Sequence, residues 1–127
     1  MKYIGSLFTL LILSVQVAFG AGPIVKFIET SHEFGNVKEA NGKVSYSFKF
    51  TNTGDSPLVV LSATTSCGCT KPVFPKEPVE PGDTAVIHVT YNPVGRPGEF
   101  DKNITVKTNS VKDSKIRLKI SGVVIPK

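Results

Sequence analysis

The stretch KVSYSFKFTN, residues 43–52, alternates apolar and polar side chains. Its apolar side chains are those of Val44, Tyr46, Phe48 and Phe50. Successive side chains of an extended strand point to opposite faces of a sheet, so this pattern places one face in a core and the other in water. The same alternation recurs through residues 21–127, where helical periodicity is absent. The chain is therefore predicted to be all-β.

Comparable alternation marks further strands along the chain. TAVIHVTYN at residues 84–92 places His88 on the polar face of its strand. DKNITVKTN at 101–109 and KIRLKI at 115–120 follow the same rule. Less regular candidates lie at 24–29, around Phe34 and at 58–65. Turn-forming residues separate these segments, and about seven short strands within roughly 100 residues predict an immunoglobulin-like β-sandwich.

One long connection carries prolines at every third position. In KPVFPKEPVEPGD, residues 71–83, these are Pro72, Pro75, Pro78 and Pro81. The spacing aligns all four on one edge of a polyproline II helix. A docking ligand for a proline-recognition domain is one interpretation. We favour a stiff crossover between the two sheets.

The first residues, MKYIGSLFTLLILSVQVAFG at 1–20, have the pattern of a secretory signal peptide. A lysine precedes an apolar run from Leu7 to Leu13, and small residues close the segment at a cleavage-like spacing. The run is shorter than the roughly 20 residues that cross a bilayer, so we expect cleavage after Gly20 rather than a membrane anchor. The remaining chain, 21–127, is expected to be a single secreted or periplasmic domain without stable membrane insertion.

The charge pattern argues against nucleic-acid binding. The formal net charge is +5, but basic and acidic residues are interleaved, whereas a nucleic-acid site needs clustered cations. The one exception places Lys115, Arg117 and Lys119 on a single strand face. We interpret that face as a solvated one that discourages edge-to-edge aggregation, in preference to an anion-binding patch.

The two cysteines, Cys67 and Cys69, lie one glycine apart in SCGCT, residues 66–70. Residues i and i+2 of an extended strand are about 6.6 Å apart, near the upper limit for a disulfide, so closure needs a bend that Gly68 would permit. A disulfide that closes a ring of three residues stabilises the fold by roughly 1.6 kcal/mol at most, so it would contribute little to stability. Exposed, strained disulfides are easily reduced, which would suit a redox role.

The same two cysteines are candidate metal ligands. A pair of thiolates on a bent segment suits Cu(I), which tolerates low coordination. Zinc fits less well, because a structural site needs four ligands and only His32 and His88 remain. A third interpretation is a local turn in which hydroxyl groups cap the backbone and the sulfur atoms merely pack or pair. No cofactor other than Cu(I) is expected, and these alternatives stay open.

No catalytic residues are predicted. Nothing places a base beside either sulfur, and the chain lacks a phosphate-binding glycine loop, a zinc-protease motif and a nucleophile elbow. The residues around the cysteines are instead candidates for a binding loop. They are Ser66, Gly68, Thr70 and Lys71.

Four segments carry a resemblance to a known family. They are FGNV at 34–37, FTNTG at 50–54, LVVLSATTSCGCT at 58–70 and PGDTAVIHVTYNP at 81–93. Together they resemble the bacterial secreted domain-of-unknown-function family 1573, a relative of the Hydin, ASH and major sperm protein group of immunoglobulin-like domains. The resemblance extends from about Phe27 to Val123. It implies a sandwich of seven or eight strands and export, and it implies no activity.

These features predict an exported, non-enzymatic binding or scaffold module of the cell envelope, whose partner is another protein or an envelope component. The alternative is a thiol site at Cys67 and Cys69, either a redox-active disulfide or a Cu(I) carrier. A purely structural envelope domain is a third hypothesis. Edge strands of a sandwich can accept another strand, so β-augmentation is one way in which such a module could bind.

Overall fold

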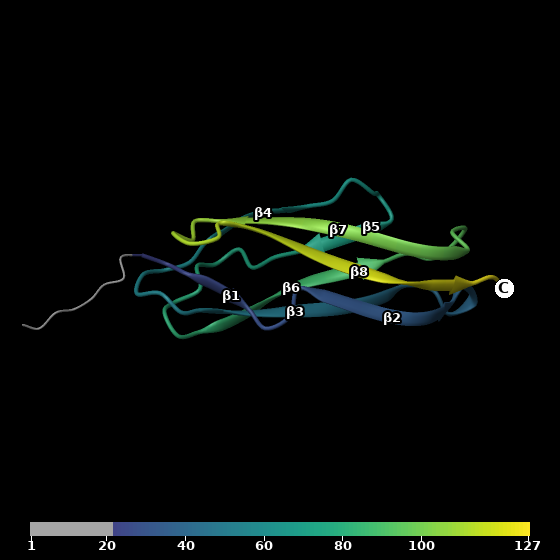
Figure 1. Ribbon diagram of the computed structural model, residues 1–127, viewed down its shortest axis with the longest axis horizontal. Coiled ribbons are helices and arrows are strands. Elements are labelled where there is room, and N and C mark those ends of the chain that lie inside the picture. Colours follow the sequence, from purple (N-terminus) through teal and green to yellow (C-terminus); the bar gives the residue numbers. More distant parts are fainter. Residues whose placement is uncertain (1–21) are drawn as a thin grey trace, which may run out of the picture.

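The computed structural model describes residues 22–127 as two facing four-stranded sheets (Figure 1). The strands are β1 (Val25–Phe27), β2 (Ser31–Lys38), β3 (Val44–Asn52), β4 (Val60–Thr64), β5 (Thr70–Val73), β6 (Thr84–Tyr91), β7 (Gly98–Thr108) and β8 (Lys115–Ile125). A 3-10 turn, η1 (Glu39–Asn41), links β2 to β3. The predicted signal peptide, residues 1–20, lies outside the described residues. No helix within residues 22–127 has the length and apolar character needed to cross a bilayer.

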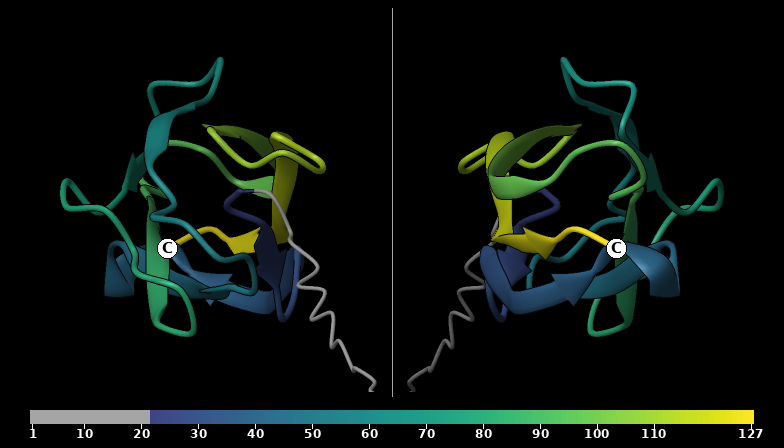
Figure 2. Two further views of the ribbon diagram at one scale, coloured as in Figure 1. Left: turned by 90° about the vertical axis from the view of Figure 1, so that its left-hand side faces the viewer. Right: turned by 90° about the vertical axis from the view of Figure 1, so that its right-hand side faces the viewer.

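The strand order confirms the predicted immunoglobulin-like sandwich. One sheet has the order β1-β3-β6-β5, with antiparallel pairing throughout. The other has the order β2-β8-β7-β4, in which β2 runs parallel to β8 and the remaining pairs are antiparallel. The end-on views in Figure 2 show the two layers. The structure has eight strands where the sequence pattern predicted about seven.

The alternation predicted for residues 43–52 is confirmed. Phe48 and Phe50 are 0% exposed, whereas Ser47 and Lys49, the residues that alternate with them, face solvent. His88 also lies on the solvent side, as predicted, with its Nδ1 atom 3.0 Å from Oγ of Ser47 on the neighbouring strand. A two-residue period therefore identified the faces of β3 and β6 correctly.

The core lies between the sheets and joins them through apolar side chains. Tyr91 of β6 and Phe100 of β7 stack across the interface with their ring centroids 4.0 Å apart. The largest fully buried apolar side chains belong to Tyr91, Phe48, Phe50, Leu58, Ile87, Ile104, Leu118 and Ile120. Burial of this apolar surface is the main force that holds a sandwich of this size together.

The interpretation of residues 71–83 as a crossover between sheets is wrong. Thr70–Val73 forms β5, an edge strand antiparallel to β6, and the rest of the proline-rich segment returns to β6 within the same sheet. Pro72 is tolerated there because an edge strand needs hydrogen bonds on one side only. The chain crosses between the sheets just before this segment, in residues 65–69 between β4 and β5, which we call the disulfide loop.

The predicted role of the basic face of β8, to discourage edge-to-edge pairing, stays a prediction. Lys115, Arg117 and Lys119 are exposed as expected, and Leu118 and Ile120 are buried. β8 pairs with β7 along most of its length but with β2 only from Lys119 to Ile125, so among the described residues the stretch from Lys115 to Leu118 has a strand on one side only. Alternation specifies which face a residue occupies and carries no information about a strand's neighbours.

Candidate functional site

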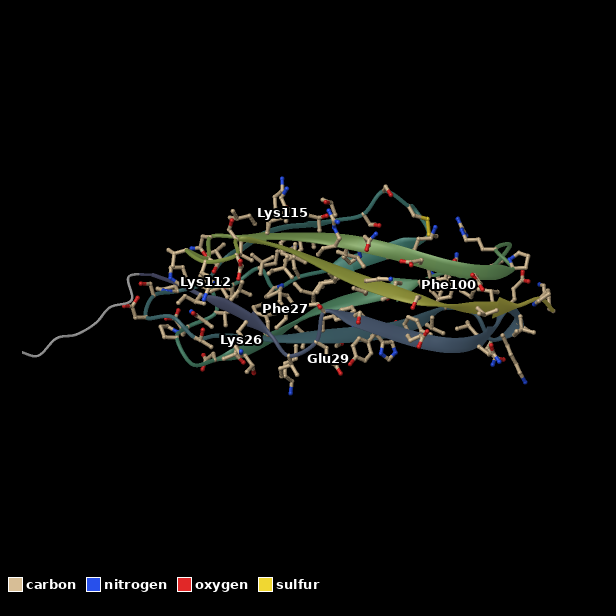
Figure 3. All side chains as sticks on the ribbon, in the orientation of Figure 1. Lys26, Phe27, Glu29, Phe100, Lys112 and Lys115 are labelled. Carbon is tan, nitrogen blue, oxygen red and sulfur yellow. A yellow bond between two sulfur atoms is a disulfide. The ribbon has the colours of Figure 1, made fainter. Side chains whose placement is uncertain are left out.

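The disulfide loop carries the chain from one sheet to the other and arches away from both (Figure 1). Cys67 and Cys69 are joined in a disulfide, drawn as a yellow bond near the start of β5 (Figure 3). Their Cα atoms are 5.1 Å apart. That separation is shorter than the roughly 6.6 Å of an extended strand, so the backbone bends at the bond.

The two sulfur atoms have different surroundings. Cys69 is 3% exposed, whereas Cys67 is only partly buried against the edge of the core. The backbone N–H of Cys69 donates to Sγ of Cys67 across 3.1 Å, and the Thr70 hydroxyl lies 3.4 Å from Sγ of Cys69. Cys67 is therefore the sulfur that a molecule arriving from solvent would meet first.

Backbone hydrogen bonds anchor the disulfide loop to the first sheet. The N–H of Asn92, just beyond β6, donates to the carbonyl of Cys69 across 2.9 Å. The N–H of Thr70 donates back to the carbonyl of Cys67 across 3.2 Å. These bonds and the disulfide restrain the backbone of the loop at several points.

Three of the predicted loop residues, Ser66, Gly68 and Lys71, are exposed. Thr70 is 5% exposed, so its side chain lies beneath the loop rather than on its contact surface. The bend expected for ring closure is present, but it does not depend on the freedom of a glycine at position 68. The φ angle of Gly68 is outside the left-handed region, and a Cβ atom there would meet nothing within 4 Å.

A small hollow of about 130 Å³ lies beside the disulfide loop. It is lined by Lys43, Gly68, Cys69, Lys71, Thr90 and Asn92. Sequence reasoning missed three of these residues, namely Lys43, Thr90 and Asn92. No local sequence pattern marks these residues. Val44 of β3 and Thr70 of β5 both pair with Tyr91 of β6, one on each side, and this pairing brings the residues next to them in sequence close together.

Two lysines line the hollow, and no acidic residue does. Within residues 22–127 the one ion pair joins Lys119 to Asp101, so neither Lys43 nor Lys71 has a carboxylate in ion-pair contact. Burial raises the pKa of Tyr91 above its usual value, and the Arg96 guanidinium partly opposes that rise. The Tyr91 phenol, which belongs to the core next to these strands, therefore stays neutral at physiological pH and adds no charge to the site.

Histidines do not join the cysteines in a metal-binding cluster. Within residues 22–127 no group of three or more His, Cys, Asp or Glu side chains is arranged to hold a metal ion. His32 stacks on Tyr46 with ring centroids 3.7 Å apart, and His88 contacts Ser47. Cu(I) binding concerns the reduced pair of thiols, whereas the structure has the oxidised pair, so it stays a prediction.

The fold is similar to several solved structures. A protein of unknown function from Porphyromonas gingivalis W83 has a TM-score of 0.69 at 16% identity, over 80% of this chain and 46% of that one. The ASH/PapD-like domain 7 of human CEP192 has a TM-score of 0.62 at 15% identity, over 92% and 98%. The periplasmic chaperone SfaE has a TM-score of 0.53 at 14% identity, over 81% and 58%.

At these identities the similarity shows the fold alone, and this chain spans less than half the length of the P. gingivalis protein. No curated protein matches the sequence. The family model described as "Protein of unknown function (DUF1573)" matches residues 25–124, which include every strand nearly to its end. This chain therefore belongs to the DUF1573 family, and its sandwich is similar to that of an ASH/PapD-like domain.

Proposed function

We propose that this protein is an exported, non-enzymatic binding module of the cell envelope and that the disulfide loop, with Lys43 and Lys71 at its base, is a contact surface for a partner protein. The observation that carries the proposal is the construction of the loop. It projects from the sandwich, and the ring between Cys67 and Cys69 and the bond from Asn92 hold it in place (Figure 1).

A projecting loop on a rigid scaffold is the usual location of a binding surface in a sandwich. The restrained backbone of the loop supports a binding role, because a loop that is already ordered loses less conformational entropy on association. The exposed residues of the loop include Ser66 and Gly68, which offer hydrogen-bonding groups, and Lys71 adds a charge. A partner with acidic groups opposite Lys43 and Lys71 would complement this surface.

Two features support an extracytoplasmic location. The signal-like segment at residues 1–20 predicts export. A disulfide persists in oxidising compartments and is rare in the cytosol, where thiols are kept reduced. The periplasmic chaperone among the similar structures is in keeping with a protein-binding role outside the cytoplasm.

Site-specific photo-crosslinking in cells that export the protein tests the proposal. A photoreactive amino acid replaces Ser66 in one variant and Lys26 of β1 in a control variant. Both positions are exposed, and Figure 3 shows Lys26 far from the disulfide. Illumination should yield a discrete protein adduct at position 66 and none at position 26.

A second pair of variants links the adduct to the charge of the hollow. Combined Lys43→Glu and Lys71→Glu should reduce the adduct at position 66, whereas Lys26→Glu should leave it unchanged. If positions 66 and 26 give the same adducts, or neither gives any, the loop is not a binding surface.

A thiol-exchange function is the second candidate, and the unequal burial of the two sulfur atoms favours it. A thiolate of an external dithiol would attack Sγ of Cys67, break the S–S bond and release Cys69 as a thiolate, which then takes up a proton. The Thr70 hydroxyl is placed to donate to that thiolate. The second thiol of the reductant would then displace Cys67, leaving both cysteines reduced and the reductant oxidised.

A further inference from the structure

A second and larger hollow opens where β5 ends. Its volume is about 380 Å³, and the surface that lines it is almost entirely apolar. We call it the apolar groove, and its lining residues are Val73, Phe74, Pro75, Ala85, Val86 and His88. Val73 is 51% exposed and Val86 is 39% exposed. Apolar side chains that gather in solvent commonly mark an interaction surface, so the apolar groove is a candidate for docking.

The end of β5 explains why the apolar groove is open. β5 pairs with β6 as far as Val73, so among the described residues positions 84–87 of β6 have β3 on one side and no strand on the other. The next hydrogen-bonded pair would join Pro75 to Val86, and a proline has no N–H to donate. The chain therefore leaves β6 at this point, and the groove forms between the two segments.

The apolar groove adjoins the hollow beside the disulfide loop. Lys71 pairs with Thr90 and lines that hollow, whereas Val73 pairs with His88 and lines the groove. Residues i and i+2 of a strand point to the same face about 6.6 Å apart, so Lys71 and Val73 occupy neighbouring positions on one surface. A single extended ligand can therefore reach both hollows.

Lysines flank the apolar groove on two sides. Lys43 and Lys71 line the adjoining hollow, and Lys49 of β3 lies opposite Val86. All three lysines are exposed, and none of them has a carboxylate in ion-pair contact within residues 22–127. The strands β3, β5 and β6 contain no acidic residue. The charge of this surface therefore favours an acidic partner.

We propose that the apolar groove and the lysines beside it bind an extended segment of a partner protein with the pattern acid-x-apolar-x-acid, where x is any residue. In such a segment the three named side chains point to the same side, about 6.6 Å apart. A leucine or phenylalanine enters the groove, one carboxylate meets Lys43 and Lys71, and the other meets Lys49. This inference rests on the proposed function and names the chemistry of the partner.

The partner is a different protein, because this chain does not contain the pattern. Among its acidic residues only Glu29 and Glu33 lie four positions apart, and the residue midway between them is Ser31. Residues 1–21, which lie outside the described part of the chain, contain no Asp or Glu. Neither a second copy nor the N-terminal segment can therefore place an apolar side chain between two carboxylates.

Three synthetic peptides with blocked ends test the pattern on the full exported protein. The first has glutamate, leucine and glutamate at alternate positions with serine between them. The second has serine in place of leucine, and the third has lysine in place of both glutamates. In NMR titrations the first peptide should shift the amide signals of Val73, Val86 and His88. It should bind about tenfold more tightly than either of the others, and its advantage over the lysine peptide should shrink as salt is added.

A pair of apolar variants locates the bound leucine. Val73→Ser should weaken binding of the first peptide several-fold, because it removes an apolar wall of the groove. Leu61→Ser should leave binding unchanged, although Leu61 of β4 is 61% exposed and so at least as accessible as Val73.

A pair of charge variants locates the carboxylates. Combined Lys43→Glu and Lys71→Glu should remove the preference for the glutamate peptide over the lysine peptide. Combined Lys107→Glu and Lys115→Glu should keep it, because these two lysines belong to the second sheet and the change in net charge is the same.

Equal binding of the leucine and serine peptides, no binding of any peptide, or signal shifts confined to the second sheet would overturn the inference. So would a wild-type dimer in sedimentation experiments that Val73→Ser dissociates, since the occupant would then be a second copy. Crosslinks at position 66 without peptide binding at the apolar groove would reject this inference alone. Peptide binding at the groove without crosslinks at position 66 would reject only the disulfide loop as a contact surface.

Discussion

Cys67 and Cys69 form one covalent unit but are unequal in chemical terms. Cys67 is partly accessible and accepts an N–H from Cys69, whereas Cys69 is 3% exposed. A thiolate reacts only where a reagent can reach it, and a hydrogen-bond donor favours the charged form. The difference in exposure therefore makes Cys67 the sulfur open to attack and Cys69 the sulfur that is released.

We predict that the single-cysteine variants differ in reactivity. Cys69→Ser leaves the accessible thiol of Cys67, which should react roughly tenfold or more faster with an aromatic disulfide reagent than the buried thiol that remains in Cys67→Ser. The release of the coloured thiolate gives both rates. In a denaturant the two rates should become equal. Similar rates in the folded state would remove the support for Cys67 as the point of attack.

Gly54 and Gly68 differ in whether the fold has room for a side chain at their positions. A Cβ atom on Gly54 would lie 2.2 Å from the Gly22 carbonyl oxygen and 2.6 Å from the Ile24 nitrogen, so the backbone of the N-terminal segment would have to move. A Cβ atom on Gly68 would meet nothing.

Gly54→Ala should therefore lower the free energy of unfolding by about 2 kcal/mol or more, whereas Gly68→Ala should change it by less than about 0.5 kcal/mol and leave the disulfide formed. Urea denaturation and thiol titration measure the two effects. A large loss of stability in Gly68→Ala would mean that the loop needs a conformation that only glycine adopts.

The end of β3 shows how one buried side chain holds several segments together. Asn52 is 0% exposed. Its Oδ1 atom accepts the backbone N–H groups of Ile24 and Gly54, and its Nδ2 group donates to the carbonyls of Ser56 and Val79. This residue therefore joins the segment before β1, the turn after β3 and the connection that leads to β6.

We predict that Asn52→Ala lowers the free energy of unfolding by about 3 kcal/mol or more, because it leaves buried backbone groups without partners. Asn109 is a matched control, since its amide also bonds to two backbone groups, those of Val59 and Pro57, but in an exposed position. Asn109→Ala should cost about 1 kcal/mol, because water can replace the amide. Urea denaturation of both variants gives the comparison, and equal losses would show that burial is not the cause.

The molecule as a whole depends on packing rather than on its disulfide. The apolar faces of both sheets meet in one continuous core, whereas the disulfide closes a ring of three residues at its margin. Closing so short a ring removes little entropy from the unfolded chain.

Reduction should therefore lower the free energy of unfolding by no more than about 1.6 kcal/mol and leave the sandwich folded. Urea denaturation with and without a reductant, followed by circular dichroism in the far ultraviolet, measures this difference. Unfolding on reduction, or a decrease of several kcal/mol in the free energy of unfolding, would show that the fold depends on the disulfide. That result would weaken both proposed roles for the loop.

Local pattern was sufficient to predict the all-β class, the buried faces of β3 and β6 and the polar position of His88, because a two-residue period needs only neighbouring residues. It also identified Cys67 and Cys69. The short strand β5 was not predicted, because Pro72 is compatible with a strand only at the edge of a sheet. Which strands lie at an edge depends on the order of strands in the whole sheet. The pairing of β2 with only the second half of β8 and the meeting of Lys43 with Lys71 likewise follow from contacts between distant segments. Alternation determines which face a side chain occupies, whereas strand order and the sites at strand edges arise only when the whole chain has packed.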